Sequence, residues 1–160
     1  MYRLIAENRK HLDRWLRWSS ALDSVKEVAA FIGQFEAKEQ AGDGFHLGLW
    51  DGEQLAGGVV CWGIHRGNRN AEVGYWLGAN FTRRGLATRG AKSIIAHLFE
   101  HESLHRVEMQ CGVDNRASRA VAERCGLTAE GIRRGSHWIT DRFVDHVVYG
   151  VLESEWEASR

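Results

Sequence analysis

The hydrophobic pattern of the chain changes period near residue 80, and this change limits what the chain can fold into. Before it, apolar residues alternate with polar ones between short turns, which predicts strands at 45–50, 55–64 and 71–77. After it, apolar residues recur at the spacing of one helix face, at Leu86, Ala87, Ala91, Ile94, Ile95 and Leu98. Three closely connected strands followed by a helix indicate a mixed α/β protein whose sheet begins with an antiparallel meander.

The rest of the chain continues as alternating helices and strands, with no repeat or linker. Ser24 is a typical N-cap for a helix that the glycine-rich turn at 41–44 ends, and Gly126 suits the left-handed position after a helix. The further elements predicted from periodicity are helices at 2–18 and 116–124 and strands at 107–113, 127–138 and 143–152. We therefore expect one domain, residues 1–160, in which a central, mostly antiparallel and twisted sheet of about six strands is flanked by about four helices.

Composition and charge argue against several classes of function. Acidic and basic side chains number 21 each, so the net charge gives no support for binding of nucleic acid or of an anionic membrane. No apolar run approaches the roughly 20 residues of a membrane span, and we expect no signal peptide from the first residues. Cys61, Cys111 and Cys125 are odd in number and lie mostly in apolar patterns, which favours buried, reduced thiols in a cytoplasmic protein.

Segment 74–88 joins a strand to a helix through a turn that carries two arginines and a glycine. The first N–H groups of a helix lack intrahelical acceptors and lie at the positive end of its dipole. Gly85 and Ala87 leave these groups unshielded, and Arg83 and Arg84 add charged donors, so the turn predicts a pyrophosphate site. It lacks both the Gly-Lys-Ser/Thr ending of a Walker loop and the Gly-x-Gly-x-x-Gly pattern of dinucleotide-binding folds.

The turn resembles the acetyl-CoA loop of the GNAT superfamily, Gln/Arg-x-x-Gly-x-Gly/Ala, with Thr82 in place of the first Gln or Arg. Further segments resemble RimJ/RimL-type ribosomal-protein N-acetyltransferases, namely 8–18, 71–77, 113–118 with 125–127, and 145–149. The resemblance implies a GNAT fold and an N-acetyltransferase that uses acetyl-CoA. The cofactor contacts that it implies are Leu77, Thr82, Arg83, Arg84, Gly85, Leu86, Ala87, Thr88, Asn115 and Ser118.

The same resemblance suggests roles for individual residues. Ser118, one helical turn after Asn115, is expected to hydrogen-bond the leaving thiolate, and Asn115 to contact the amide groups of the pantetheine arm. From the residues alone, Asn115 is equally suited to be the N-cap of the helix at 116–124.

Two residues compete as general base. His65 ends a strand, and its ordinary pKa of about 6.5 suits proton transfer at neutral pH. Glu72 shares a strand face with Gly74 and Trp76, near the expected position of the thioester. The resemblance slightly favours His65, and a water molecule acting as the base is a third option.

The acceptor is predicted mainly from the resemblance, which points to a protein N-terminus and to ribosomal proteins. Neutralising an α-amine of pKa near 8 at pH 7 costs about 1.4 kcal/mol, against about 4.6 kcal/mol for a lysine, so a weak base is sufficient. Two alternatives stay open. One is an acetyltransferase for small amines such as polyamines or aminosugars, although the acidic residues do not cluster; the other is a non-catalytic acyl-CoA-binding module.

Histidines and tryptophans suggest other roles less strongly. His97, His101 and His105 recur every four residues, but a zinc site would need a further ligand and a carboxylate at fixed spacing. We expect a solvated helix face and no bound metal. The seven tryptophans are expected mainly in the core, with three of them as alternative candidates for an acceptor groove or a homodimer contact: Trp15, Trp18 and Trp50.

Overall fold

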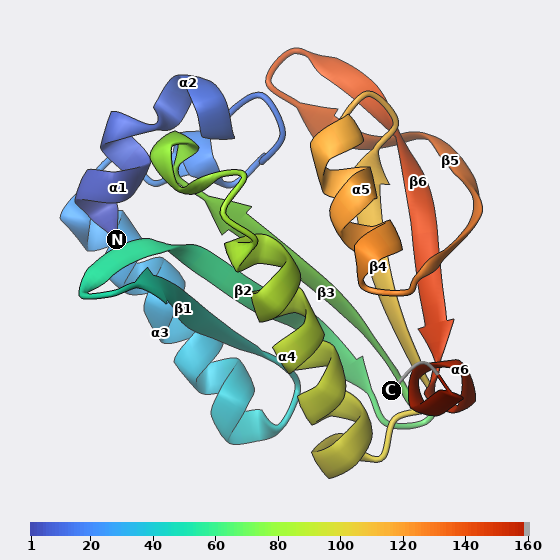
Figure 1. Cartoon of the computed structure of the whole chain (residues 1–160). Helices are drawn as coiled ribbons and strands as arrows, with labels where there is room; N and C mark the ends of the chain where they lie inside the picture. The colour runs from blue at the N-terminus through green and yellow to red at the C-terminus, as the bar shows by residue number, and fades with distance from the viewer. Residues whose placement is uncertain (159–160) are drawn as a thin grey trace.

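The computed structural model describes residues 1–158 and confirms a mixed α/β fold with a six-stranded sheet (Figure 1). The strands are β1 (Phe45–Asp51), β2 (Gln54–His65), β3 (Asn70–Leu77), β4 (Arg106–Gly112), β5 (Thr128–Ile139) and β6 (Arg142–Leu152). The helices are α1 (Tyr2–Glu7), α2 (Arg9–Leu12), α3 (Val25–Ala41), α4 (Leu86–Glu102), α5 (Arg116–Arg124) and α6 (Glu153–Ala158), with short 3-10 turns at Ser19–Ala21 and Ala79–Phe81. No helix in this part of the chain is long and apolar enough to cross a membrane.

The sheet consists of two halves that meet along a short junction. Its strand order is β1-β2-β3-β4-β6-β5, and every neighbouring pair is antiparallel except β3 and β4. The parallel pairing of β3 with β4 covers only 70–72 against 106–108. Beyond that point the two strands diverge, as Figure 1 shows from the lower end of the sheet upwards. The inner edges of both strands are therefore open to another hydrogen-bonding partner.

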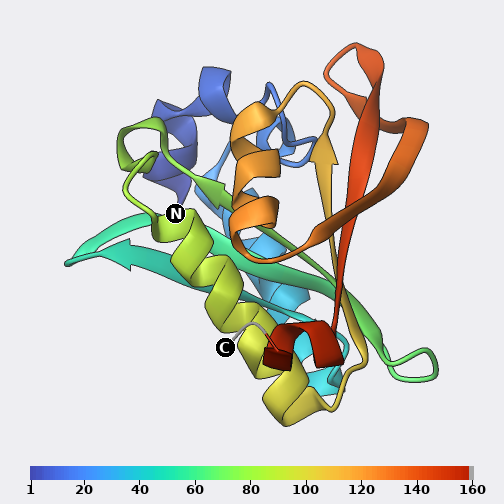
Figure 2. The ribbon, with the colours of Figure 1, turned by 45° about the vertical axis from the view of Figure 1, so that its right-hand side comes forward.

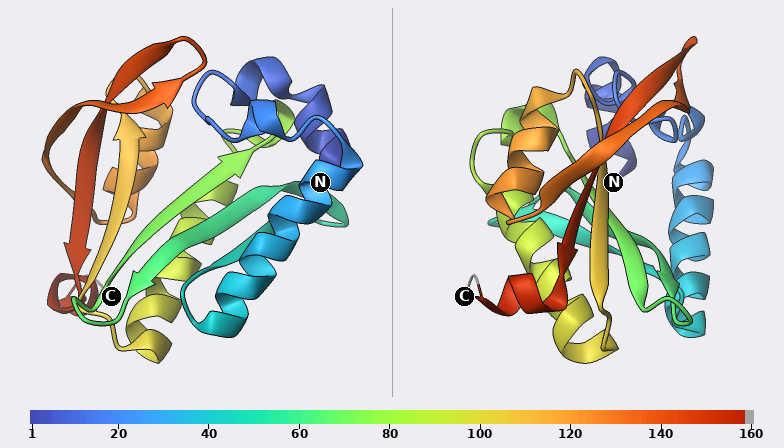
Figure 3. Two further views of the ribbon diagram at one scale, coloured as in Figure 1. Left: turned by 180° about the vertical axis from the view of Figure 1, so that it is seen from behind. Right: turned by 90° about the vertical axis from the view of Figure 1, so that its right-hand side faces the viewer.

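The helices cover the two faces of the sheet unequally. Helices α4 and α5 lie side by side on one face (Figure 2), and α3 lies on the other face, behind β1 to β3. On the α3 side, none of the described helices covers β4, β6 and β5, as the left view of Figure 3 shows. The outer half of the sheet thus has one face without a helical layer.

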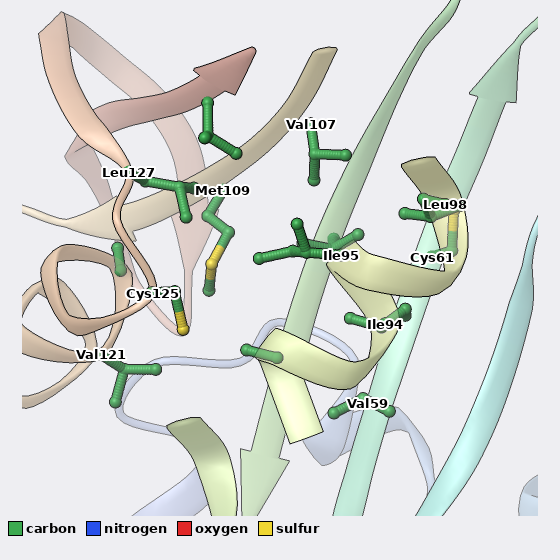
Figure 4. Packing of buried hydrophobic residues seen from close by; sticks show 14 of the residues in the cluster. Val59, Cys61, Ile94, Ile95, Leu98, Val107, Met109, Val121, Cys125 and Leu127 are labelled. Carbon is green, nitrogen blue, oxygen red and sulfur yellow. The ribbon is translucent and has the colours of Figure 1, made fainter. Parts of the chain in front are cut away.

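The main core lies between the sheet and helices α4 and α5 (Figure 4). Ile95 and Leu98 of α4 and Val107 of β4 are completely buried there, and burial of such a side chain contributes roughly 1.5–3 kcal/mol. Helix α4 approaches the sheet closely at Gly90, where a Cβ would lie 2.6 Å from a methyl group of Leu49. The three cysteines are buried and free, in agreement with the prediction of buried thiols.

The predicted helix at 2–18 is wrong in extent, and residues 1–158 contain six helices rather than about four. The helical conformation is interrupted at Asn8, whose side-chain nitrogen donates to the Leu4 carbonyl oxygen at 2.8 Å. Its side-chain oxygen accepts from the Ala79 N–H, also at 2.8 Å. Because this amide bonds the backbone on both sides, it ends α1 and ties the N-terminal helices to the turn before α4.

For the helices that follow α1 and α2, the predicted start at Ser24 and the predicted end at Gly126 are confirmed. The Ser24 hydroxyl accepts from the Glu27 N–H at 3.2 Å, and the Glu27 carboxylate accepts from the Ser24 N–H at 3.0 Å, which forms a capping box. Gly126 follows α5 with a left-handed φ of 84°. Helix α4 ends at Glu102, so His105 lies beyond it and the three histidines do not share one helix.

Candidate active site

A cleft of about 1040 Å³ lies where β3 and β4 diverge. Tyr75 and Cys111 reach it from the face that carries α4 and α5, whereas Glu72 and Gln110 reach it from the opposite face. The cleft therefore passes through the sheet. The start of α4, the helix α5, the segment 11–18 and the β5–β6 hairpin complete its walls.

The turn before α4 exposes the amide groups at the start of that helix. Arg83 and Gly85 both have a left-handed φ, 61° and 76°, and Gly85 is the N-cap residue. Among the described residues, no side chain caps the helix and no acidic residue occupies its first turn. The N–H groups of Leu86, Ala87 and Thr88 therefore keep their hydrogen-bonding capacity at the positive end of a 17-residue helix, which suits a diphosphate.

Positive charge surrounds these amides. Arg83, Arg89 and Arg124 line the cleft, the last of them from the end of α5. Arg84 does not line it, because its guanidinium bonds Asp51 at 2.7 Å and lies over the Phe81 ring at 5.6 Å. The other predicted cofactor contacts do line the cleft, namely Leu77, Thr82, Arg83, Gly85, Leu86, Ala87, Thr88, Asn115 and Ser118.

Two hydroxyl groups meet in the middle of the cleft. Ser118 Oγ donates to Cys111 Sγ at 3.3 Å, and its side chain also interacts with Tyr75. Burial raises the pKa of Tyr75 to about 12, so the phenol remains a proton donor at neutral pH. A thiol is a weak acceptor, and the Ser118 hydroxyl can turn to a better one at little cost.

Asn115 acts as the N-cap of α5, the alternative left open by the sequence. Its side-chain oxygen accepts from the Ser118 N–H at 3.1 Å. Because Asn115 also lines the cleft, the cap and a contact with a bound ligand are compatible. The bond fixes the first turn of α5 and thereby the position of Ser118.

Glu72 lies in the cleft, at the last position of β3 that pairs with β4. Burial raises the pKa of its carboxyl group, and the nearby Glu108 carboxylate raises it further. The Gln110 side chain opposes this shift by donating to the carboxylate at 2.9 Å. Arg133 donates in turn to the Gln110 oxygen at 3.3 Å. The chain of contacts from Arg133 to Glu72 holds a carboxylate of increased basicity inside the cleft.

His65 lies elsewhere. It is exposed at the end of β2, where it pairs with Asn70 at the base of the sheet, and it does not line the cleft. The structure thus brings Glu72 together with Ser118 and the α4 turn, and it leaves His65 outside this group. A strand-end position in the sequence could not show at which end of the sheet the cleft would form.

A pair of histidines in the last hairpin was not predicted from the sequence. The rings of His137 and His146 lie 3.9 Å apart in the cleft. The pKa of His137 is lowered to about 4 by burial and by the nearby His146, Arg133 and Arg17. Burial lowers the pKa of His146 as well, so both rings are neutral at pH 7. Only the register of β5 on β6 reveals the pair.

The remaining candidates are distributed as follows. Trp15 and Trp18 line the cleft, whereas Trp50 is exposed at the end of β1. The His97 and His101 rings lie 4.9 Å apart on α4, and residues 1–158 contain no group of His, Cys, Asp and Glu side chains that could hold a metal ion.

Comparison with known proteins agrees with this geometry. The family model of the acetyltransferase (GNAT) domain matches residues 1–128. YdaF of Bacillus subtilis (strain 168), provisionally assigned as a ribosomal N-acetyltransferase, is 31% identical over 98% of this chain and 86% of its own length. The ribosomal-protein-serine acetyltransferase of Escherichia coli (strain K12) is 26% identical over 97% of this chain and 87% of its own.

A solved structure supports the same assignment. The crystal structure of the microcin C7 self-immunity acetyltransferase MccE, in complex with acetyl-CoA and AMP, superposes with a TM-score of 0.90. It is 28% identical and covers 94% of this chain and 84% of that chain. Since the fold, the unshielded helix start and the family match all agree, this chain belongs to the GNAT family and is an N-acetyltransferase that uses acetyl-CoA.

Proposed function

We propose that this acetyltransferase modifies the α-amine at the N-terminus of a protein, with ribosomal proteins as the substrate class. The observation that carries the proposal is the cleft that passes through the sheet. On one side it meets the start of α4, and on the other it meets the face of β4, β6 and β5 that no described helix covers. The relatives named for ribosomal proteins support the same substrate class.

The cofactor end of the cleft matches what acetyl-CoA requires. Acetyl-CoA supplies the acetyl group as an activated thioester. The N–H groups of Leu86, Ala87 and Thr88, together with Arg83 and Arg89, would hold the diphosphate. The open edges of β3 and β4 offer backbone hydrogen bonds to peptide-like amides of the pantetheine arm.

The reaction requires a neutral amine, and Glu72 is suited to take its proton. An α-amine of pKa near 8 is mostly protonated at pH 7, and removal of its proton costs about 1.4 kcal/mol. The Glu72 carboxylate has a raised pKa and is held by Gln110, so it can accept this proton directly or through water. His65, outside the cleft, has no comparable path.

Ser118 is suited to stabilise the departing sulfur. As the carbon–sulfur bond breaks, negative charge develops on sulfur, and the Ser118 hydroxyl can exchange its weak bond to Cys111 for one to this thiolate. The Tyr75 hydroxyl is the alternative donor, because it lies beside Ser118 and stays protonated.

A panel of acceptors tests the substrate class. The enzyme and acetyl-CoA are supplied with an N-terminal serine peptide, the same peptide with a blocked N-terminus and an internal lysine, spermidine, and an aminoglycoside, while thiol release is measured. We expect the free N-terminal peptide to have the highest kcat/KM, by at least tenfold. Preference for the lysine peptide or spermidine would contradict the proposal. Thermal stabilisation by acetyl-CoA without thiol release from any acceptor would indicate a binding module instead.

Substitution of the base candidates separates their roles. We expect Glu72→Gln to lower kcat about 100-fold, since general base catalysis contributes factors of this size, while the Kd for acetyl-CoA changes less than about threefold. The pH profile of kcat should lose the rise that deprotonation of Glu72 produces. His65→Ala should stay within about twofold of the wild type. If Glu72→Gln keeps the wild-type kcat while His65→Ala lowers it, His65 is the base and the assignment is wrong.

Removal of the Ser118 hydroxyl tests the proposed thiolate donor. We expect Ser118→Ala to lower kcat at least tenfold with little change in KM, because the hydrogen bond strengthens only as charge develops on sulfur. Ser93→Ala, an exposed position in α4, serves as the matched control and should be neutral. If Ser118→Ala is also neutral while Tyr75→Phe is slow, the donor is Tyr75.

A further inference from the structure

The acceptor half of the cleft has two walls that come from distant parts of the chain. One wall is the segment after α2, with Leu16, Arg17 and Trp18, and the other is the β5–β6 hairpin, with His137 and His146. The Thr140 hydroxyl at the hairpin turn donates to the Asp13 carbonyl at 3.2 Å and joins the two walls. Figure 3 shows the hairpin tip beside the N-terminal helices.

Positive charge on these walls is not balanced by ion pairs. Arg17 lines the cleft from the first wall, and Arg133 reaches toward it from β5 through Gln110. Within residues 1–158, no carboxylate lies within ion-pair distance of either guanidinium. Both arginines are near enough to His137 to lower its pKa, so their positive charges act on the same part of the cleft.

The carboxylates of Asp13 and Asp145 belong to these walls, but neither lines the cleft. Asp13 accepts from the Ser19 hydroxyl at 2.6 Å, and Asp145 accepts from the Gly135 N–H at 2.7 Å. Glu72 is the one carboxylate among the described residues that line the cleft, and the proton transfer uses it. His137 and His146 are neutral at pH 7 and add no charge of either sign.

We infer that the acceptor site selects an amine carried beside anionic groups, specifically a protein N-terminus whose second or third residue is acidic. This inference rests on the proposed function and specifies its substrate. Unpaired arginines at the mouth attract a carboxylate and repel a second cation. A polyamine, which places several ammonium groups in the site, is the least suitable acceptor.

The test compares acceptor peptides that differ only in charge. Two peptides begin with serine and carry either two aspartates or two lysines at the next positions. A second pair has a blocked N-terminus and one internal lysine acceptor flanked by aspartates or by arginines. We expect the acidic member to have a kcat/KM at least tenfold higher, mainly through KM. Raising the salt from about 50 to 300 mM should reduce the ratio, because exposed charges are screened.

Substitutions test whether Arg17 causes the preference for acidic peptides. Arg17→Gln should reduce the ratio about threefold, Arg17→Lys should retain most of it, and Lys26→Gln, an exposed charge removal on α3, should leave it unchanged. Equal kcat/KM values for the acidic and basic peptides, or a ratio that Arg17→Gln does not change, would overturn the inference. Acetylation of internal lysines alone would instead contradict the α-amine proposal, and the flanked pair would still report the charge preference.

Discussion

The short parallel junction between β3 and β4 is the constraint on which the site depends. Each strand is fully paired on its outer side, β3 with β2 and β4 with β6, so the two halves of the sheet are stable without a longer junction. At the base, Arg69 fixes the junction by accepting from the N–H groups of His105 and Arg106. Above Glu72, the inner edges have no strand partner, and buried backbone groups in this state need water or a ligand. The opening is therefore a product of the topology.

The electrostatics divide the cleft into three parts with different tasks. At the α4 end, helix amides and arginines present positive charge to a diphosphate. In the middle, neutral hydroxyls and one carboxylate of raised pKa lie in a partly desolvated space, where proton transfer and charge stabilisation are most effective. At the far end, neutral histidines and unpaired arginines form the acceptor mouth. Acetyl transfer needs a site for the cofactor, a site for proton transfer and a site for the acceptor. The cleft places these three environments next to one another in that order.

Much of this arrangement was predictable from local patterns. The turn at 82–88, the cap at Ser24 and the six strands depend on residues close together in sequence, and local propensities determine them. The break at Asn8 was not predictable, since the side chain that ends α1 is fixed by Ala79, a residue 71 positions away. The positions of Arg84 and His65 outside the cleft were not predictable for the same reason. The ion pair with Asp51 that holds Arg84 and the antiparallel register that places His65 depend on contacts between segments distant in the sequence. Gln110 and His146 belong to the cleft only because β4 pairs with β6 in one particular register.

The central claim is that the backbone amides at the start of α4 hold the diphosphate of the cofactor. Titration of isotope-labelled protein with coenzyme A, followed by amide NMR, tests this most directly. The account predicts that the amide signals of Gly85, Leu86, Ala87 and Thr88 move together and saturate with one equivalent, while Gly33, in α3 and outside the cleft, stays unchanged. If these four signals stay in place while coenzyme A binds and shifts another region, the diphosphate is held elsewhere and the account is wrong.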